Sequence, residues 1–549
     1  MSRAIPRWLA AWRVKAAPPG LVATVLVATV LAGTVLLAGT SASAQGFHDT
    51  GDDIRAHEDP DDFTFELHGY FRGRGESLTN LDLDRGVGPS GDPLFAVPLD
   101  DPRAQTLYQA DMRMRADVSV YAPGGVVAIH TRLDVLDNLT LGSTPDDIPS
   151  ATVGQRALDN ALHLRRAWAE ALTPFGLFTL GRQANTWGLG LLANGGDCND
   201  CDGGDVADRV AFATPLLEHV WALSFDISAT GPLGRRASGF RAVDLTPTDD
   251  VRTLTLAWLR WHSDAARLRR HVAGRTTVEY GAYLSHRWQE GDVPASYLPA
   301  SVPVTPSASQ VVPRGLSAVA TDVWLRVENR DVRVEFEAAF LYSRIAQASL
   351  VPGVLLRDPV TATQFGAALE TDFLPRDSAF TFGFDAGFAS GDSAPGFGAF
   401  PRALQASPQP GDLDGPQATL PYDTTVDNFR FHPDYRIDRI LFREIVGRVT
   451  DAFYFRPHLR VRLFDAPFGA LSATLFGVTS FAVEPSSTPG GDRPLGVEVD
   501  PALTYQTHEG FVAALEYAAL FPLSGLDNPA LGLGASPAQL LRLRLQMLY

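Results

Sequence analysis

A short acidic segment, residues 195–205, contains both cysteines of the chain and four aspartates. In an oxidising compartment, Cys198 and Cys201 could form a disulfide. Calcium prefers hard oxygen ligands, and the segment offers those of Asp197, Asn199, Asp200, Asp202 and Asp205. Zinc would need two more soft ligands, which the segment lacks. The open interpretations are therefore a structural calcium site and a solvated acidic loop, and no other cofactor is expected.

Arginine alternates with apolar residues in several other segments. In residues 109–120, for example, Asp111, Arg113 and Arg115 alternate with alanine and methionine. The arginines that share one face of such segments are Arg72, Arg74, Arg113, Arg115, Arg132, Arg326, Arg333, Arg456, Arg460, Arg462, Arg542 and Arg544. The carboxylates on the same face are Glu66, Asp111, Asp117, Asp134, Asp322, Glu328, Glu335 and Glu337.

Two interpretations fit this mixture of charges. If these segments are strands of a barrel, the charges of neighbouring strands could pair with one another inside its polar lumen. Alternatively, the charges could form a pathway that selects solutes, because rings of charged side chains set the selectivity of pores. Since the planar guanidinium suits carboxylates and phosphates, anions would be favoured by Arg460, Arg462, Arg542 and Arg544.

Motifs for catalysis are missing from the sequence. It contains no H-E-x-x-H, G-x-S-x-G or Walker motif. The twelve histidines are scattered, and any of them could lie beside a serine or aspartate at the rim of a barrel, as the catalytic groups of a hydrolase would. We therefore expect no enzyme, with a barrel-embedded hydrolase as an alternative.

The elements that must position these charges are long strands of period two. Residues 63–74 place Phe63, Phe65 and Phe71 on one face and Arg72 and Arg74 on the other. Alternation over roughly ten residues is typical of a tilted strand that crosses a bilayer, whereas strands of soluble sandwiches average about five or six residues. The clearest such segments are 63–74, 109–120, 129–135, 322–328, 332–340, 455–463 and 541–549. Weaker ones begin near residues 161, 177, 217, 251, 275, 361, 378, 469, 498 and 510.

These segments predict an all-β fold, a single closed antiparallel transmembrane barrel of about 16 to 18 strands, with 18 favoured. Turn residues predict tight periplasmic connections at 123–125, 173–176, 329–331 and 466–469. Longer loops are predicted at 80–104, 142–160, 188–208, 230–250, 291–316, 391–440 and 484–494. The loop 391–440 is too long for an ordinary connection. It would either fold into the lumen as a constriction or plug, or lie outside as a lid.

The N-terminal region carries an export signal. Four basic residues precede an apolar run that begins at Leu21 and ends at Ala42-Ser43-Ala44, so residues 1–44 are predicted to be a signal peptide. Its removal takes away four basic and no acidic residues and changes the formal charge from −17 to −21. A chain this acidic is not expected to bind nucleic acid. Residues 45–62 are acidic and poor in apolar groups, which predicts a flexible periplasmic segment.

The C-terminal segment alternates apolar and polar residues back from a terminal aromatic, Tyr549. Leu541, Leu543 and Leu545 would face lipid, and Arg542 and Arg544 the lumen. This strand resembles the signal that the barrel-assembly machinery reads, so that machinery and outer-membrane lipid are expected partners. The aromatics Trp168, Trp187, Trp258, Trp261, Trp288, Trp324, Tyr342 and Tyr454 recur near predicted strand ends. Interfacial girdles explain such placement, and a sugar-binding path is the alternative.

Several segments resemble an uncharacterised family of large Gram-negative outer-membrane barrel proteins and, more loosely, porins and alginate-export channels. They are residues 69–74, 164–170, 181–183 with 187–188, 195–205 and 427–448. The resemblance implies a barrel in the bacterial outer membrane and names no substrate. The expected function is a porin-like channel for passive diffusion of small or anionic hydrophilic solutes. The alternatives are a non-conducting surface-binding or structural barrel and the hydrolase above. The oligomeric state stays open.

Overall fold

The computed structural model describes residues 62–99, 105–141, 162–231, 234–236, 242–244, 246–293, 310–351, 353–374, 378–400 and 408–549. The predicted signal peptide and the acidic segment, apart from Asp62, lie outside these residues. Among the described residues, no helix is long and apolar enough to cross a membrane.

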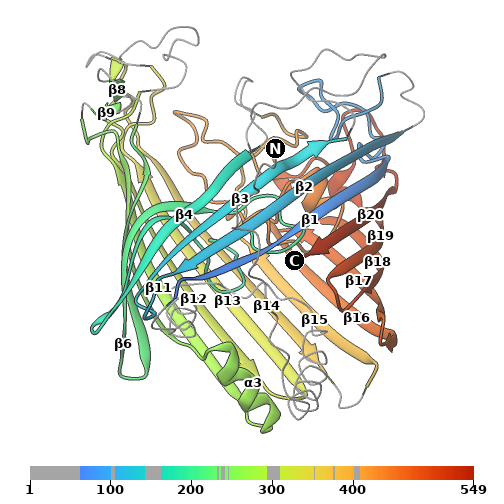
Figure 1. Ribbon diagram of the computed structural model, residues 1–549. Coiled ribbons are helices and arrows are strands. Elements are labelled where there is room, and N and C mark those ends of the chain that lie inside the picture. Colours follow the sequence, from blue (N-terminus) through green and yellow to red (C-terminus); the bar gives the residue numbers. More distant parts are fainter. Residues whose placement is uncertain are drawn as a thin grey trace, which may run out of the picture. The chain divides into compact units, whose positions relative to one another are not determined.

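Eighteen strands form one closed antiparallel sheet, in which each strand pairs with its neighbours along the chain and β1 pairs with β20 (Figure 1). The first strands are β1 (Thr64–Thr79), β2 (Thr106–Tyr121), β3 (Val127–Thr140), β4 (Leu162–Thr173), β5 (Gly176–Ala184), β6 (Val206–Leu216) and β7 (His219–Ala229). They are followed by β10 (Val251–Arg260), β11 (Thr277–Gln289), β12 (Leu316–Glu328), β13 (Val332–Ile345), β14 (Val360–Phe373) and β15 (Phe380–Ala389). The last are β16 (Ala452–Ala466), β17 (Gly469–Ala482), β18 (Pro494–Gln506), β19 (Phe511–Pro522) and β20 (Ala538–Leu548). The predicted fold, with 18 strands favoured, is confirmed.

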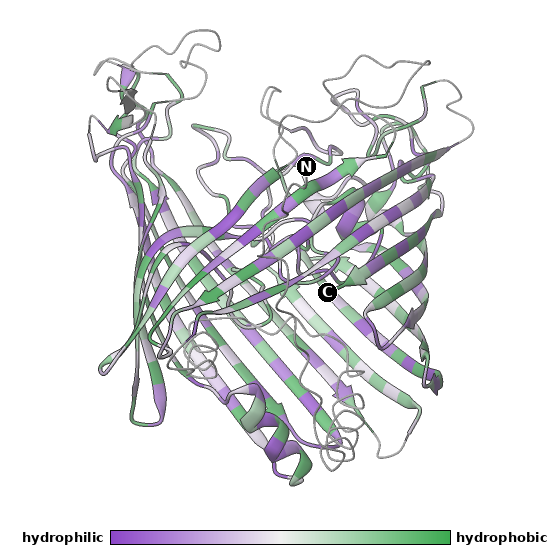
Figure 2. Ribbon diagram, viewed as in Figure 1, coloured by the Kyte–Doolittle hydropathy of each residue, from purple (hydrophilic) through white to green (hydrophobic). Residues whose placement is uncertain are grey.

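The alternation of apolar and polar residues along each strand gives the barrel wall an apolar outer face and a polar inner face. In β20, Leu541, Leu543 and Leu545 are exposed on the outer face, whereas Arg542 is buried on the lumenal face. Figure 2 shows the alternation as bands of opposite hydropathy along the strands. Because a lipid-facing surface must be apolar and a lumen can be polar, this pattern is that of a barrel that spans an outer membrane.

The two ends of the barrel differ. Short turns join β2 to β3, β4 to β5, β12 to β13 and β16 to β17, as the turn residues predict. The strand ends that flank the predicted long connections all lie at the other end, which is therefore the extracellular one. The turn end also carries α3 (Asp264–Val272), which follows its N-cap residue Ser263 and was not predicted from the sequence.

Several details differ from the prediction. Strand β6 was missed because its first residues fall within the loop predicted at 188–208. A small hairpin, β8 (Gly234–Arg236) and β9 (Ala242–Asp244), lies within the predicted loop at 230–250. The predicted loop 391–440 extends to residue 451 and contains a π-helical turn, Leu441–Ile445, and the connection 483–493 has a 3-10 turn, Pro485–Ser487. A further 3-10 turn, Ser524–Leu526, lies between β19 and β20.

The barrel closes where Tyr549 meets β1. Gly69 and Tyr549 exchange two backbone hydrogen bonds of 2.9 and 3.1 Å, and the Tyr549 hydroxyl donates to the carbonyl of Arg115 at 2.9 Å. A Cβ atom at Gly69 would lie only 2.1 Å from that carbonyl oxygen, so only glycine fits beneath the tyrosine. The terminal aromatic thus fastens the seam of the barrel, and its reading by the assembly machinery stays a prediction.

Candidate functional site: the barrel lumen

All twelve predicted arginines lie on the lumenal face of their strands. Most contact carboxylates from neighbouring strands. Arg115 binds Asp134 through two hydrogen bonds of 2.7 and 2.8 Å, and Arg333 contacts Glu335, Glu370 and Asp372. Arg462 is 40% exposed and pairs with Asp465, near the periplasmic end. Cross-strand pairing, the first of the two interpretations, therefore accounts for most of these arginines.

The β5–β6 connection, residues 185–205, folds back into the lumen against the wall of β1–β4. Cys198 and Cys201 form a disulfide at its tip. Its backbone carbonyls accept hydrogen bonds from wall arginines: Arg113 donates to Cys201 at 2.6 Å and Arg115 to Gly196 at 2.9 Å. On the opposite wall, the carboxylate of Glu337 on β13 accepts the N–H groups of Gly190 and Leu191 at 3.0 and 3.1 Å. The loop is thus attached to both sides of the barrel.

Two aspartates of this loop form the centre of a cluster of arginines. Asp200 lies within 4.0 Å of Arg72, Arg74, Arg436, Arg443 and Arg542. Asp202 contacts Arg72, Arg74, Arg113, Arg436 and Arg443. Burial alone would raise the pKa of each carboxyl, but these guanidinium groups hold both values well below the ordinary one. Both aspartates are therefore ionised and fix the loop in place.

Asp197 makes a similar contact closer to β3 and β4. It binds Arg132 and, at 2.9 Å, Arg166. Burial raises the pKa of Asp197, while Arg166 and Arg132 lower it to about 2. Guanidinium groups contact three of the four carboxylates that the sequence offers to calcium, those of Asp197, Asp200 and Asp202. Among the described residues, the group of acidic side chains close enough to share a metal ion is instead Asp244, Asp249 and Asp250. Calcium binding by residues 197–205 stays a prediction that no converging set of ligands supports.

Much of the described part of the long β15–β16 connection, residues 390–400 and 408–451, also lies in the lumen. Its apolar side chains pack against inward residues of the wall, among them Tyr454, Leu520 and Leu540. The loop side of this core includes Phe397, Phe429, Phe431, Ile440, Leu441, Phe442 and Ile445. On β18, Glu498 accepts the N–H groups of Arg439, Ile440 and Leu441 at 2.8, 2.8 and 3.0 Å. The described parts of this loop therefore pack against the lumenal side of the wall, and a constriction or plug formed by the loop stays a prediction.

The two lumenal loops contact each other directly. Asp434 accepts the N–H groups of Asp202 and Gly203 at 3.1 and 3.3 Å, and the N–H of His432 donates to the carbonyl of Leu191 at 2.7 Å. Together with the arginine contacts to Asp200 and Asp202, these bonds join both loops into one partition. The partition fills the lumen beside β1–β4 and β14–β20.

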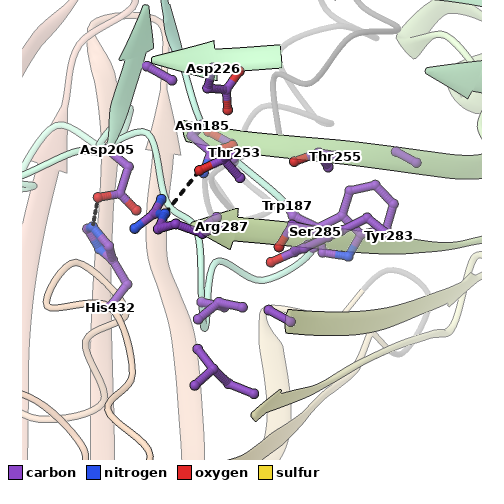
Figure 3. Close-up of a pocket in the computed structure, with 18 of the residues that line it drawn as sticks. Asn185, Trp187, Asp205, Asp226, Thr253, Thr255, Tyr283, Ser285, Arg287 and His432 are labelled. Atoms are coloured by element: carbon purple, nitrogen blue, oxygen red, sulfur yellow. Dashed lines mark hydrogen bonds and ion pairs between the residues drawn. The ribbon is translucent and has the colours of Figure 1, made fainter. Parts of the chain in front are cut away.

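A cavity of about 560 Å³ remains on the other side of the partition, along the inner face of β6, β7 and β10–β13. Figure 3 shows Trp187 and Tyr283 lying together in it, with Asp205 and His432 on the opposite side. Tyr283 and Trp187 meet edge to face, with ring centroids 5.1 Å apart. The polar residues of the lining include Asn185, Asp205, Arg209, Asp226, Thr253, Thr255, Ser285, Arg287, Arg430, His432 and Arg448.

Four arginines and two aspartates line this cavity, which leaves a formal charge of +2. Arg209 and Asp226 neutralise each other through hydrogen bonds of 2.6 and 2.8 Å. Arg287 donates to the hydroxyl of Thr253 at 3.0 Å, and Asp205 lies 3.6 Å from His432. The surplus of +2 therefore comes from Arg287, Arg430 and Arg448, less the negative charge of Asp205.

None of the four cavity arginines is among the lumenal arginines predicted from the sequence. For two of them the sequence holds a usable signal, the alternation of apolar and polar residues along a strand. Arg209 lies on β6, which was not predicted, and Arg287 lies on β11, where the alternation is weak. The aromatic prediction needs correction. Trp168, Trp187, Trp261, Trp324 and Tyr454 belong to the lumen rather than to an interfacial girdle, since three of them line the cavity, Trp168 stacks on buried His130 and Tyr454 is fully buried.

One serine and one histidine do meet in the lumen. The Ser119 hydroxyl lies 2.9 Å from Nδ1 of His130, and Nε2 of His130 lies 3.7 Å from Glu170. That second distance is too long for a hydrogen bond, and the His130 ring stacks on Trp168 with centroids 4.8 Å apart. None of these residues lines the cavity, so the hydrolase alternative gains no substrate site from them.

The sequence matches no family model and no curated protein, so the resemblance to an uncharacterised barrel family stays a prediction. Among solved structures, OpdK from Pseudomonas aeruginosa is similar at 10% identity and a TM-score of 0.44, over 88% of this chain and 98% of that one. A BenF-like porin from Pseudomonas fluorescens Pf-5 matches at 8% identity and a TM-score of 0.41, over 88% and 98% of the two chains. The outer membrane channel DcaP of Acinetobacter baumannii matches at 12% identity and a TM-score of 0.36, over 89% and 97%. The likeness is one of fold, and the barrel itself carries the conclusion: the chain is a closed 18-stranded outer-membrane barrel.

Proposed function

We propose that the protein is a porin-like channel through which small hydrophilic solutes, including anions, cross the outer membrane passively. The observation that carries this proposal is the cavity beside the partition. Along β10 it is lined from Thr253, near the extracellular end, to Trp261, just beyond the periplasmic end. Eight residue steps of about 3.4 Å cover about 27 Å of strand, and at a tilt near 40° this is about 20 Å of height, most of an apolar band about 25 Å tall.

The lining suits a hydrated, charged solute. Hydroxyl groups of Thr253, Thr255 and Ser285 lie near the arginines, and such groups can replace part of the water around a solute. The partition packs against the wall of β1–β4 and β14–β20 and leaves the cavity on the other side for solutes. A narrow passage with a surplus of positive charge is the result.

Planar-bilayer recording tests the proposal. The protein would be refolded into detergent and its folded state checked by heat-modifiable migration on a gel. Discrete conductance steps in KCl are expected from the folded protein. Folded protein that inserts and gives no steps would contradict the channel and favour a non-conducting surface-binding or structural barrel.

A further inference from the structure

A short ribbon inside the β15–β16 loop presents two arginines to the cavity. The N–H of Phe431 donates to the carbonyl of Val449 at 2.9 Å, and Arg430 pairs with Thr450 in an antiparallel bridge. Successive residues of a ribbon point to opposite faces. Phe429, Phe431 and Val449 are accordingly buried in the apolar core, while Arg430, His432 and Arg448 line the cavity.

These two arginines differ from those of the wall. Among the residues that the structure describes, no carboxylate lies within 4.0 Å of either guanidinium, and the Nε atoms of both are buried without a hydrogen-bond partner. Asp392 acts on Arg430 from a greater distance, as Asp205 and Asp434 do on Arg448. The nearest described partner of the Arg448 guanidinium is the ring of Phe400, 4.3 Å from its centroid.

Their positions make positive charge unfavourable. Burial, and then the neighbouring Arg430, lower the pKa of Arg448 to about 10. Two desolvated like charges that share a cavity repel each other, and an anion between them would relieve both the repulsion and the missing hydrogen bonds. A guanidinium presents a planar fork of N–H donors, which matches the oxygens of a carboxylate or phosphate.

We propose that Arg430 and Arg448 form an oxyanion-binding site in the lumen, which takes the carboxylate or phosphate group of a small solute. Arg287 of β11 lines the same cavity and adds a third positive charge. The role of this site in selectivity rests on the proposed function, whereas binding itself does not require conduction. The two arginines that select anions therefore lie on a ribbon of the β15–β16 loop and not on a strand of the barrel wall.

The test compares Arg430→Gln and Arg448→Gln with Arg182→Gln. Arg182 is 51% exposed on the outer face and pairs with Asp208, so its substitution changes the net charge equally, away from the cavity. Calorimetric titration of the folded protein with inorganic phosphate, and separately with acetate, would measure binding. We expect a loss of about tenfold to hundredfold in affinity for each cavity variant, the usual effect of removing a charge-assisted hydrogen bond, and none for Arg182→Gln.

Reversal potentials in a KCl gradient give a second measurement. Both cavity variants should shift the selectivity toward cations, and Arg182→Gln should leave it unchanged. Absence of phosphate and acetate binding to the native protein, or unchanged affinity in both cavity variants, would overturn the site. If the native protein binds these anions through the two arginines but never conducts, the proposed function fails and the binding site stands.

Discussion

Asp200→Asn should loosen the partition that the two loops form inside the lumen. The substitution keeps the shape of the side chain and removes the charge that holds Arg443 at 2.8 Å, Arg436 at 3.3 Å and Arg74 at 3.4 Å. The Asp200 side chain is only 20% exposed. Removing one partner of a buried ion pair costs about 3 to 5 kcal/mol. Because Asp202 stays beside several of the same arginines, we expect the lower end, about 3 kcal/mol of unfolding free energy.

Urea unfolding in lipid vesicles, followed by tryptophan fluorescence, would measure this loss. Asp208→Asn is the matched control, because Asp208 is 53% exposed and its pair with Arg182 should contribute less than about 1 kcal/mol. In a double-mutant cycle, Asp200→Asn and Arg443→Gln together should cost about 1 to 3 kcal/mol less than the sum of the two single costs. A loss of stability no larger than the control, with additive costs in the cycle, would refute the cluster as the fastening of the loops.

Three further predictions concern the loops and the seam. Replacing residues 391–447 by a short Gly-Ser linker should raise the single-channel conductance, because the loop core packs on the wall; unchanged conductance would show that the loop does not narrow the path. Burial raises the pKa of Asp451 to about 7, against about 3.9 unfolded, so its contribution to stability is present below pH 4 and is lost as the pH rises toward 7. From pH 5 to pH 8, the unfolding free energy of the native protein should therefore fall by about 2 to 3 kcal/mol relative to that of Asp451→Asn. Urea unfolding at several pH values would measure both, and the same pH dependence in the two proteins would contradict this. Tyr549→Phe keeps the aromatic ring but removes the hydrogen bond to the carbonyl of Arg115. We therefore expect a loss of about 1 kcal/mol in unfolding free energy and normal insertion into the membrane. A failure to insert would mean that the hydroxyl is needed for assembly.

The barrel could be predicted because one physical pattern covers the whole wall. Every strand separates lipid from lumen, so its sequence has to alternate, as residues 63–74 and 541–549 do. Apolar and polar residues alternate along β6 as well. This strand begins directly after the acidic segment, however, so its first residues were included in the predicted loop 188–208.

The site could not be predicted in the same way, since it depends on contacts between distant loops. The aspartates of residues 197–202 suit calcium as well as arginine, and only the folded chain brings Arg436 and Arg443 to them. Within the long loop, residues 428–432 read Asn-Phe-Arg-Phe-His, a period of two that indicates a strand-like segment. Its apolar residues reach a core, and Arg430 reaches a cavity, only because the loop folds inward.

Thiol labelling along the lumen tests most directly whether solutes pass beside the partition. The chain has two cysteines, which form a disulfide, so an introduced cysteine would be the only free thiol. Thr255→Cys lies in the cavity, Leu256→Cys faces lipid at 47% exposure, and Ser480→Cys is 1% exposed on the opposite, filled side of the lumen. A negatively charged methanethiosulfonate reagent should lower the conductance of Thr255→Cys and leave the other two unchanged. Block at Ser480→Cys without block at Thr255→Cys would place the path elsewhere and contradict the account.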